Sequence, residues 1–189
     1  MNTPLRILGI CGSLRKNSLN RSVLAAAQEL APEGAGIETF DLHEIPIFHP
    51  DEEATPPRIV VEFKARIRAA DAILFVSPEY NYSIPGVLKN AIDWGSRPYG
   101  HSAWQGKPAG IMGASPGNFG TLRMQIHLRQ IFVFLNMHPL NTPEVLITGA
   151  AQKFDKAGRL ADQPTRDLIR KYLEALALWT RRLEHGKGA

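Results

Sequence analysis

The sequence predicts an α/β protein in which a parallel sheet is covered by helices on both faces. Short apolar segments alternate with helical patterns along the whole chain, and many of those segments are rich in β-branched residues. Apolar runs without polar alternation are typical of parallel strands that are buried on both faces. Strands that alternate with helices build βαβ units. The 189 residues, 44% of them hydrophobic, fit one domain over residues 1–189.

Five strands are expected, each short and bounded by polar or turn residues. They are predicted at 5–11, 36–41, 72–77, 109–113 and 144–148, and the second has the weakest pattern. Five segments with helical patterns lie between or after them, at 21–30, 58–69, 84–93, 121–135 and 164–184. The proline-rich passage 45–57 is predicted as a loop.

The polar loop after the first strand, residues 12–20, predicts an anion site. Its hydroxyls come from Ser13 and Ser18, its amide from Asn20 and its guanidinium from Arg15. The helix that follows adds unpaired backbone N–H groups and a positive dipole end. The loop lacks the spacing of a P-loop or of a dinucleotide fingerprint, so a phosphate monoester fits best. The alternative is a Ser/Asn-capped loop without a ligand.

Two further loops are expected at the same edge, beyond the carboxyl ends of the parallel strands. Residues 78–86 carry aromatic side chains, an amide and two prolines, which suit a planar ring with hydrogen-bonding edges. Residues 114–120 are small and glycine-rich, which allows close backbone approach. A phosphate at one end and a flat polar ring at the other describe a mononucleotide such as FMN.

Two motifs occur in a specific order along the chain. The first is Gly12-Ser13-Leu14-Arg15 with Ser18 and Asn20, and the second is Pro78-Glu79-Tyr80-Asn81 leading into residues 88–94. Together they resemble the NADPH-dependent FMN reductases of the flavodoxin-like superfamily, and most of all the bacterial NAD(P)H quinone and chromate reductases. The resemblance spans about residues 5–182. It implies a flavodoxin-like three-layer sandwich with a five-stranded parallel sheet in the order 2-1-3-4-5.

The resemblance also implies the residues that hold noncovalent FMN. The phosphate is expected against Ser13, Arg15, Ser18, Leu19 and Asn20. The ring and ribityl chain are expected along Pro78, Glu79, Tyr80 and Asn81, with Tyr82 and Ser83 on the same edge and Ser115 and Gly117 in the third loop. Pro116 removes one backbone donor there. We expect Glu79 to accept backbone hydrogen bonds rather than to act as a general acid.

The implied activity is a two-step transfer in which NAD(P)H reduces the flavin and a quinone, free flavin, chromate or azo compound is then reduced on the same face. The flavin carries the chemistry, so no catalytic side chain is expected. The alternatives are a flavodoxin-type electron carrier and a non-catalytic flavin-binding regulator. Such carriers are usually acidic, whereas this chain has a net charge of +4. Arg97 is a possible contact for the donor's phosphates or an ordinary surface arginine.

The remaining expectations concern partners and location. The six histidines and one cysteine show no metal-ligand spacing, and the dispersed basic residues do not predict nucleic-acid binding. No apolar stretch is long enough for membrane insertion, and the first four residues carry no signal pattern, so we expect a cytoplasmic protein.

Apolar groups on more than one side of 121–135, together with the resemblance, predict a homodimer or homotetramer. His127 is expected to be a helix residue without chemistry.

Overall fold

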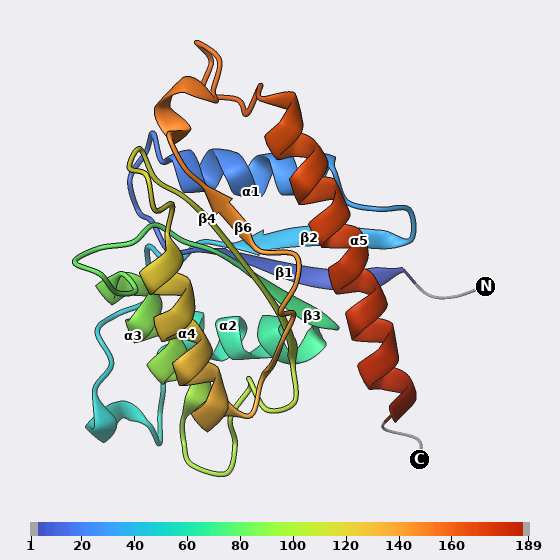
Figure 1. The fold of residues 1–189 in the computed structure, drawn as a ribbon. Coiled ribbons are helices and arrows are strands. Elements are labelled where there is room, and N and C mark those ends of the chain that lie inside the picture. The colour runs from blue at the N-terminus through green and yellow to red at the C-terminus, as the bar shows by residue number, and fades with distance from the viewer. Residues whose placement is uncertain (1–3, 187–189) are drawn as a thin grey trace.

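The computed structural model describes residues 4–186 and shows a twisted parallel sheet with helices on both faces (Figure 1). The strand order is β2-β1-β3-β4-β5, and a sixth strand, β6, also pairs with β4. The predicted order is therefore confirmed. The first three residues, part of the segment examined for a signal pattern, lie outside the described part of the chain.

The strands match the predicted segments closely, with one addition. They are β1 (Leu5–Cys11), β2 (Ala35–Phe40), β3 (Ala72–Val76), β4 (Pro108–Ala114), β5 (His138–Pro139) and β6 (Val145–Ile147). The sequence did not indicate β5, because it has two residues and one of them is a proline. It pairs with the start of β4, while β6 pairs with its end, so together they form one interrupted edge of the sheet.

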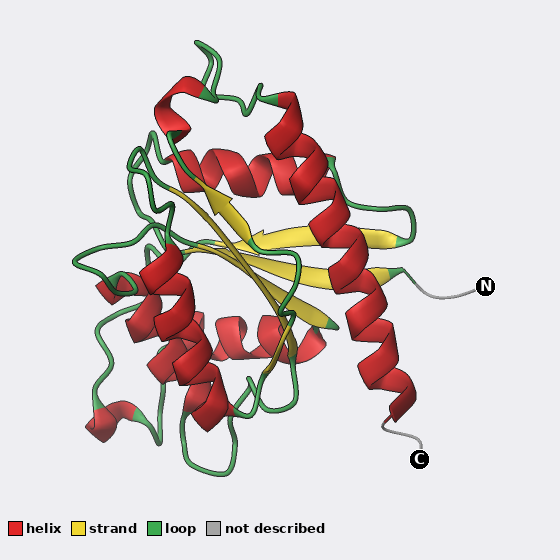
Figure 2. Ribbon diagram, viewed as in Figure 1, coloured by secondary structure: helices red, strands yellow, loops and turns green. Residues whose placement is uncertain are grey.

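The helices form two layers around the sheet (Figure 2). One layer holds α1 (Leu19–Glu29) and α5 (Gln163–His185), whose apolar side chains pack together against one face. The other holds α2 (Arg58–Ala69), α3 (Gly86–Ser96) and α4 (Leu122–Leu135), which cover the opposite face. Short 3-10 turns lie at Pro50–Glu52 and Ala150–Gln152.

Two helix starts differ from the predicted ones for local reasons. Helix α1 begins two residues early because Ser18 takes the N-cap position and accepts a hydrogen bond from the Arg21 N–H. Helix α3 begins at Gly86 rather than at Ile84, because a residue before a proline is biased away from helical geometry and Pro85 occupies the N-cap position. Both helices start at the carboxyl edge of the sheet.

The strand ends at this edge approach each other closely. A Cβ on Gly12, just after β1, would lie 2.3 Å from Ser77 Oγ, and a Cβ on Gly113 in β4 would lie 2.4 Å from the Ser77 carbonyl oxygen. Glycine at these two positions therefore lets β1, β3 and β4 end side by side. The three loops that follow these strands are gathered at the left of Figure 1.

Across residues 4–186, no helix is long and apolar enough to cross a membrane. The same residues bring together no group of three or more His, Cys, Asp or Glu side chains that could hold a metal ion. Cys11 is buried at the end of β1, and burial raises the pKa of its thiol.

Candidate functional site

The loop after β1 presents backbone donors at the start of α1. The Ser18 hydroxyl caps the N–H of Arg21, with 3.3 Å between oxygen and nitrogen. In the described chain, the N–H groups of Leu19 and Asn20 have no hydrogen-bond acceptor. These two donors and the helix dipole face the loop, which is the arrangement that binds a phosphate at a helix N-terminus.

The side chain of Asn20 has a structural function that its position in the sequence did not reveal. Its amide nitrogen donates to the Ala114 carbonyl oxygen at 3.0 Å, and its amide oxygen accepts from the Ala114 N–H at 2.8 Å. Asn20 is buried, and the paired bonds join α1 to the end of β4. Its amide is therefore engaged within the protein, and its backbone N–H is the group left for an anion.

Two arginines lie in or near this loop, and Arg21, unlike Arg15, has protein partners for its guanidinium. Arg15 is exposed, and within residues 4–186 its guanidinium has no hydrogen-bond or ion-pair partner. Arg21, which the sequence analysis did not single out, donates from Nε to the Ser13 carbonyl oxygen at 3.1 Å and pairs with Asp41 at 3.2 Å. Burial by itself raises the pKa of Asp41, but the Arg21 hydrogen bonds and the His43 N–H outweigh it and lower that pKa. Arg21 thus braces the loop, and Arg15 is available to a ligand.

The loop after β3 contains a tight turn with unusual backbone geometry. Tyr80 and Ser83 exchange backbone hydrogen bonds of 3.0 and 2.9 Å. Between them, Asn81 and Tyr82 have φ angles of 49° and 65°. Left-handed geometry is tolerated by asparagine but is uncommon for a tyrosine, so the turn holds strain of a kind that clusters at functional sites. Both tyrosines are exposed.

Glu79 anchors this loop to helix α4. Its Oε2 accepts hydrogen bonds from the backbone N–H groups of Arg123 and Met124 at 2.9 and 3.1 Å. Thr121, at the N-cap of α4, makes no side-chain cap, so Glu79 supplies the cap from a distant part of the chain. The expectation that Glu79 accepts backbone hydrogen bonds is confirmed.

Two α4 side chains that the sequence analysis did not place in the site contact the same loop. The Arg123 guanidinium lies over the rings of Tyr82 and Phe119, 4.0 and 4.6 Å from their centroids. His127 Nδ1 lies 2.7 Å from Ser83 Oγ. His127 lies in α4, as predicted, and its contact with Ser83 was not anticipated. The contacts with Tyr82 and Ser83 have no local signal, because these partners lie 41 and 44 residues away in sequence.

The loop after β4 is held by the Ser115 side chain and by backbone hydrogen bonds to the segment after β6. Ser115 Oγ accepts from the Gly117 N–H at 3.1 Å, and the Ser115 carbonyl oxygen accepts from the Ala150 N–H at 3.0 Å. The Gly117 carbonyl oxygen accepts from the Gly149 N–H at 3.2 Å. A Cβ on Gly117 would meet only Ser115 Oγ, at 3.6 Å, within the described chain. Gly117 therefore leaves space on the outer side of this loop.

The three loops fit FMN by the chemistry of their donors. One end offers an unpaired guanidinium, two free N–H groups and a helix dipole, which suit a phosphate. The other end offers exposed aromatic rings and a rigid turn, which suit a flat ring system. Asn20 and Glu79 tie the loops together across the edge of the sheet.

Arg97 is not among these loops. It follows the last residue of α3, a helix of 11 residues that begins beside the second loop and is about 16 Å long. Its guanidinium pairs with Glu53 at 3.3 Å and lies 4.0 Å from the centroid of the Tyr99 ring. The charge of Arg97 is therefore engaged with residues outside the three loops.

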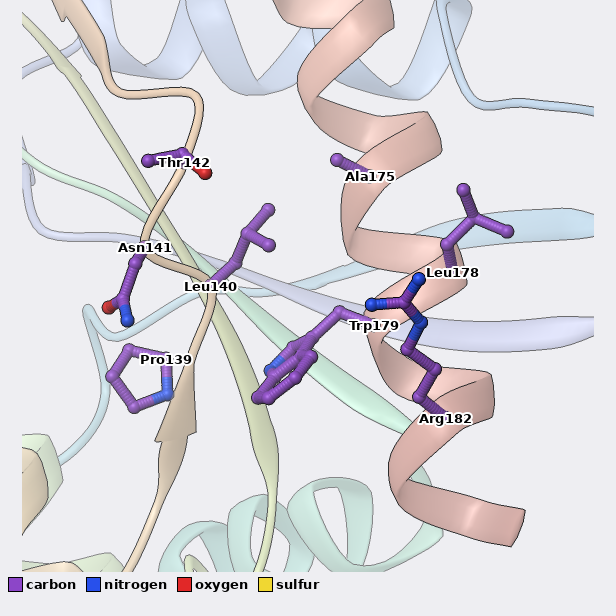
Figure 3. A pocket seen from close by; sticks show the side chains of 8 residues that line it. All are labelled: Pro139, Leu140, Asn141, Thr142, Ala175, Leu178, Trp179 and Arg182. Carbon is purple, nitrogen blue, oxygen red and sulfur yellow. The ribbon is translucent and has the colours of Figure 1, made fainter.

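A separate hollow of about 340 Å³ lies between α5 and the β5–β6 connection (Figure 3). The Trp179 indole forms part of its wall and donates to the His138 carbonyl oxygen at 2.9 Å, which ties α5 to the sheet edge. Arg182 lies along the same helix face (Figure 3). None of the lining residues belongs to the three loops, so this hollow is not part of the candidate FMN site.

The strand order and the helical layers on both faces of the sheet define a flavodoxin-like α/β protein. The family of NADPH-dependent FMN reductases matches residues 5–152, and the chain belongs to this family. Membership confirms the resemblance of the two motifs. It identifies an NAD(P)H-dependent flavoenzyme whose cofactor is FMN.

Individual relatives agree with this assignment. The chain is 53% identical over 184 residues to the NAD(P)H-dependent FMN reductase PA1204 of Pseudomonas aeruginosa, covering 97% of this chain and 99% of that protein. It is 44% identical over 182 residues to a quinone reductase of Pseudomonas putida, covering 96% and 97%. Among solved structures, the flavoenzyme NAD(P)H:(acceptor) oxidoreductase FerB of Paracoccus denitrificans has a TM-score of 0.87 at 34% identity, covering 94% of this chain and 98% of that one.

Proposed function

We propose that the enzyme binds FMN across the three loops and passes two electrons from NAD(P)H to quinones. The observation that carries the placement is that, within residues 4–186, the N–H groups of Leu19 and Asn20 and the guanidinium of Arg15 in the same loop all lack partners. Ser13 and Ser18 complete the phosphate end. The ring and ribityl chain lie along residues 78–83, with Ser115 and Gly117 on the remaining side.

The protein's own groups bind, orient and expose the cofactor. The phosphate end provides charge-assisted hydrogen bonds, which fix the position of the whole molecule. Residues 78–83 hold one edge of the ring in a rigid turn, while the loop at Gly117 leaves room for the molecule's other side. When bound, FMN would supply the hydride-transfer chemistry, so no side chain has to act as acid, base or nucleophile.

Quinones are the acceptors that the relatives favour, since one at 44% identity is named a quinone reductase. Free flavin, chromate and azo compounds remain further candidate acceptors for an open flavin face. A cytoplasmic location is part of the proposal, because a chain with a single cysteine suits a reducing compartment.

Stopped-flow spectroscopy tests this function in two half-reactions. FMN bound to the purified protein is mixed with NADH or NADPH, and loss of flavin absorbance is followed; the reduced protein is then mixed with benzoquinone. We expect rapid reduction and rapid reoxidation, and ping-pong steady-state kinetics in which excess quinone competes with NAD(P)H. If neither nucleotide reduces the bound FMN, the electron-carrier alternative replaces the proposal.

We also propose that the enzyme is a homodimer or a pair of homodimers that uses the outer face of α4. Ile126, Val133 and Phe134 on this helix are 59%, 81% and 77% exposed, while Phe132 and Leu135 are buried against the sheet. Adjacent apolar side chains at such exposure are typical of an association surface. Phe119 and Tyr82, also exposed, extend the apolar character toward the flavin loops.

Sedimentation analysis tests the association. The wild-type protein should sediment as a dimer or tetramer at micromolar concentration. Phe134→Asp should weaken association about tenfold or more, because it places a charge in an apolar interface. Leu178→Asp, at a residue of α5 that is 59% exposed, is the control and should not change the assembly. A wild-type protein that is only monomeric would rule the dimer out.

A further inference from the structure

The contact between His127 and Ser83 joins a titratable side chain to the proposed flavin loop. Ser83 Oγ and His127 Nδ1 are 2.7 Å apart, a strong hydrogen-bond distance, although the two residues are 44 positions apart in sequence. His127 is exposed on α4, and Ser83 is half-buried at the end of the turn. The proposed reaction gives His127 no role.

Both backbone polar groups of Ser83 are hydrogen-bonded to Tyr80, so its hydroxyl is the group that can change its hydrogen-bond partner. Its N–H donates to the Tyr80 carbonyl oxygen, and its own carbonyl oxygen accepts from the Tyr80 N–H. The hydroxyl has one hydrogen to donate and two lone pairs with which to accept. Whether His127 Nδ1 carries a proton therefore determines the direction of the Ser83 hydroxyl hydrogen.

Protonation of His127 fixes that direction. In the neutral tautomer that carries its proton on Nε2, Nδ1 accepts the Ser83 hydrogen, whereas Nδ1 of an imidazolium can only donate. When Nδ1 donates, the Ser83 oxygen becomes the acceptor and its hydrogen is released toward other partners. The imidazolium state therefore turns Ser83 into a donor for a ligand in the site.

The neighbouring charged groups do not share this titration. On α4, Arg123 lies one turn before His127, and the other residues at helical neighbour spacing, Met124, Gln130 and Ile131, are uncharged. Glu79 of the flavin loop pairs with Arg123 at 3.5 Å, and the loop also carries the Tyr80 and Tyr82 phenols. Among these side-chain types, histidine is the one that ordinarily changes charge between pH 5 and 8.

We propose that His127 is a positioning residue that acts through Ser83 to offer the electron acceptor a hydrogen-bond donor. The acceptor class is a neutral molecule with a carbonyl oxygen, such as a quinone, and its affinity rises as His127 becomes protonated. This inference rests on the proposed function, because it needs an acceptor beside the bound flavin. It adds a determinant of acceptor binding to a site whose other groups hold the cofactor.

Binding of 1,4-naphthoquinone to the oxidised FMN-loaded protein tests the proposal without turnover. Naphthoquinone carries no group that titrates near neutrality, and its binding is read as a change in flavin absorbance in the absence of NAD(P)H. Between about pH 8 and about pH 5, the range of histidine titration, the wild-type dissociation constant should fall about fivefold, the effect of one added hydrogen bond.

Three variants separate this role from a structural one. His127→Asn retains an amide nitrogen that can donate to Ser83 but cannot titrate, so binding should persist with a flat pH profile. Ser83→Ala should give a flat profile and weak binding throughout. His101→Asn changes an exposed histidine near the amino end of β4, at the opposite edge of the sheet, and should leave the wild-type profile intact.

The outcomes distinguish this inference from the function on which it depends. If the wild-type protein binds FMN and reduces benzoquinone but shows a flat naphthoquinone profile, the role of His127 is wrong and the function stands. The same holds if His127→Asn or Ser83→Ala keeps the wild-type pH dependence. If the wild-type protein does not bind FMN, the proposed function fails and the inference fails with it.

Discussion

The phosphate end and the ring end of the candidate site are held in place differently. At the phosphate end, Ser18 and Arg21 brace a short loop that leads directly into α1, and the groups left for a ligand are Arg15 and free backbone N–H groups. At the ring end, the turn at Asn81 is held in left-handed geometry and fastened to α4 by Glu79. The phosphate end therefore offers charge and hydrogen-bond donors to a ligand, whereas the ring end offers a fixed backbone shape.

This difference determines how each end should respond to substitution. A group that offers charge to a ligand can be removed without harm to the fold, so its loss should appear in cofactor affinity alone. A group that fixes a loop contributes to folding as well, so its loss should appear in both measurements. Asn20 belongs to the phosphate loop in sequence but fixes the fold through Ala114, and it therefore provides the strongest test of the distinction.

The largest effect is expected for Asn20→Leu. The change leaves the N–H and carbonyl groups of Ala114 buried without partners, which should lower the free energy of unfolding by about 2–4 kcal/mol and weaken FMN binding. Chemical denaturation and FMN titration measure the two quantities. Gln28→Ala is the control on the same helix: it removes one bond, to the Ile37 carbonyl oxygen, away from the three loops. Asn20→Leu protein with wild-type stability would contradict the bridging role.

Arg15→Ala should act on the cofactor only. Loss of a charge-assisted hydrogen bond to the phosphate should cost about 1.5–3 kcal/mol, or roughly tenfold or more in FMN affinity. Stability of the FMN-free protein should not change, because this guanidinium has no partner within residues 4–186. Riboflavin, which lacks the phosphate, should bind both proteins equally. Equal FMN affinity in both proteins would refute the placement of Arg15.

The smallest effect is expected for Asn81→Ala, which tests backbone shape at the ring end. Alanine at a φ of 49° is strained, so the change should cost about 1 kcal/mol and reduce flavin occupancy or turnover. Asn81→Gly is the matched variant and should be close to neutral, because glycine adopts this geometry freely. If alanine and glycine behaved alike, the side chain of Asn81 rather than its backbone would be the important feature.

Local patterns along the sequence predicted most of the fold and the first end of the site. The strand at residues 5–11 and the helix at 58–69 have the predicted bounds, because a run of apolar residues or a helical stripe is a local signal. The β5 strand was missed because pairing with β4, rather than its own residues, makes it a strand. Such pairings depend on tertiary structure that periodicity does not record.

The same limit explains what was missed in the site. The capping of Arg21 by Ser18, which the sequence offered as the alternative to a phosphate contact, is a local feature because it acts within three residues. The roles of the Asn20 amide and of His127 depend on partners 94 and 44 residues away, so neither could be found by reading neighbouring positions. Glu79 was assigned a structural role correctly, but its partner, the start of α4, became visible only in three dimensions.

The bond between Asn20 and Ala114 also sets an order of events during synthesis. The phosphate loop leaves the ribosome early, yet the residue that locks α1 against the sheet follows 94 positions later. Closing so long a segment is a late and entropically costly step in folding. The loop that we propose to hold the phosphate is therefore translated early, but its bond to β4 can form only after residue 114 has been made.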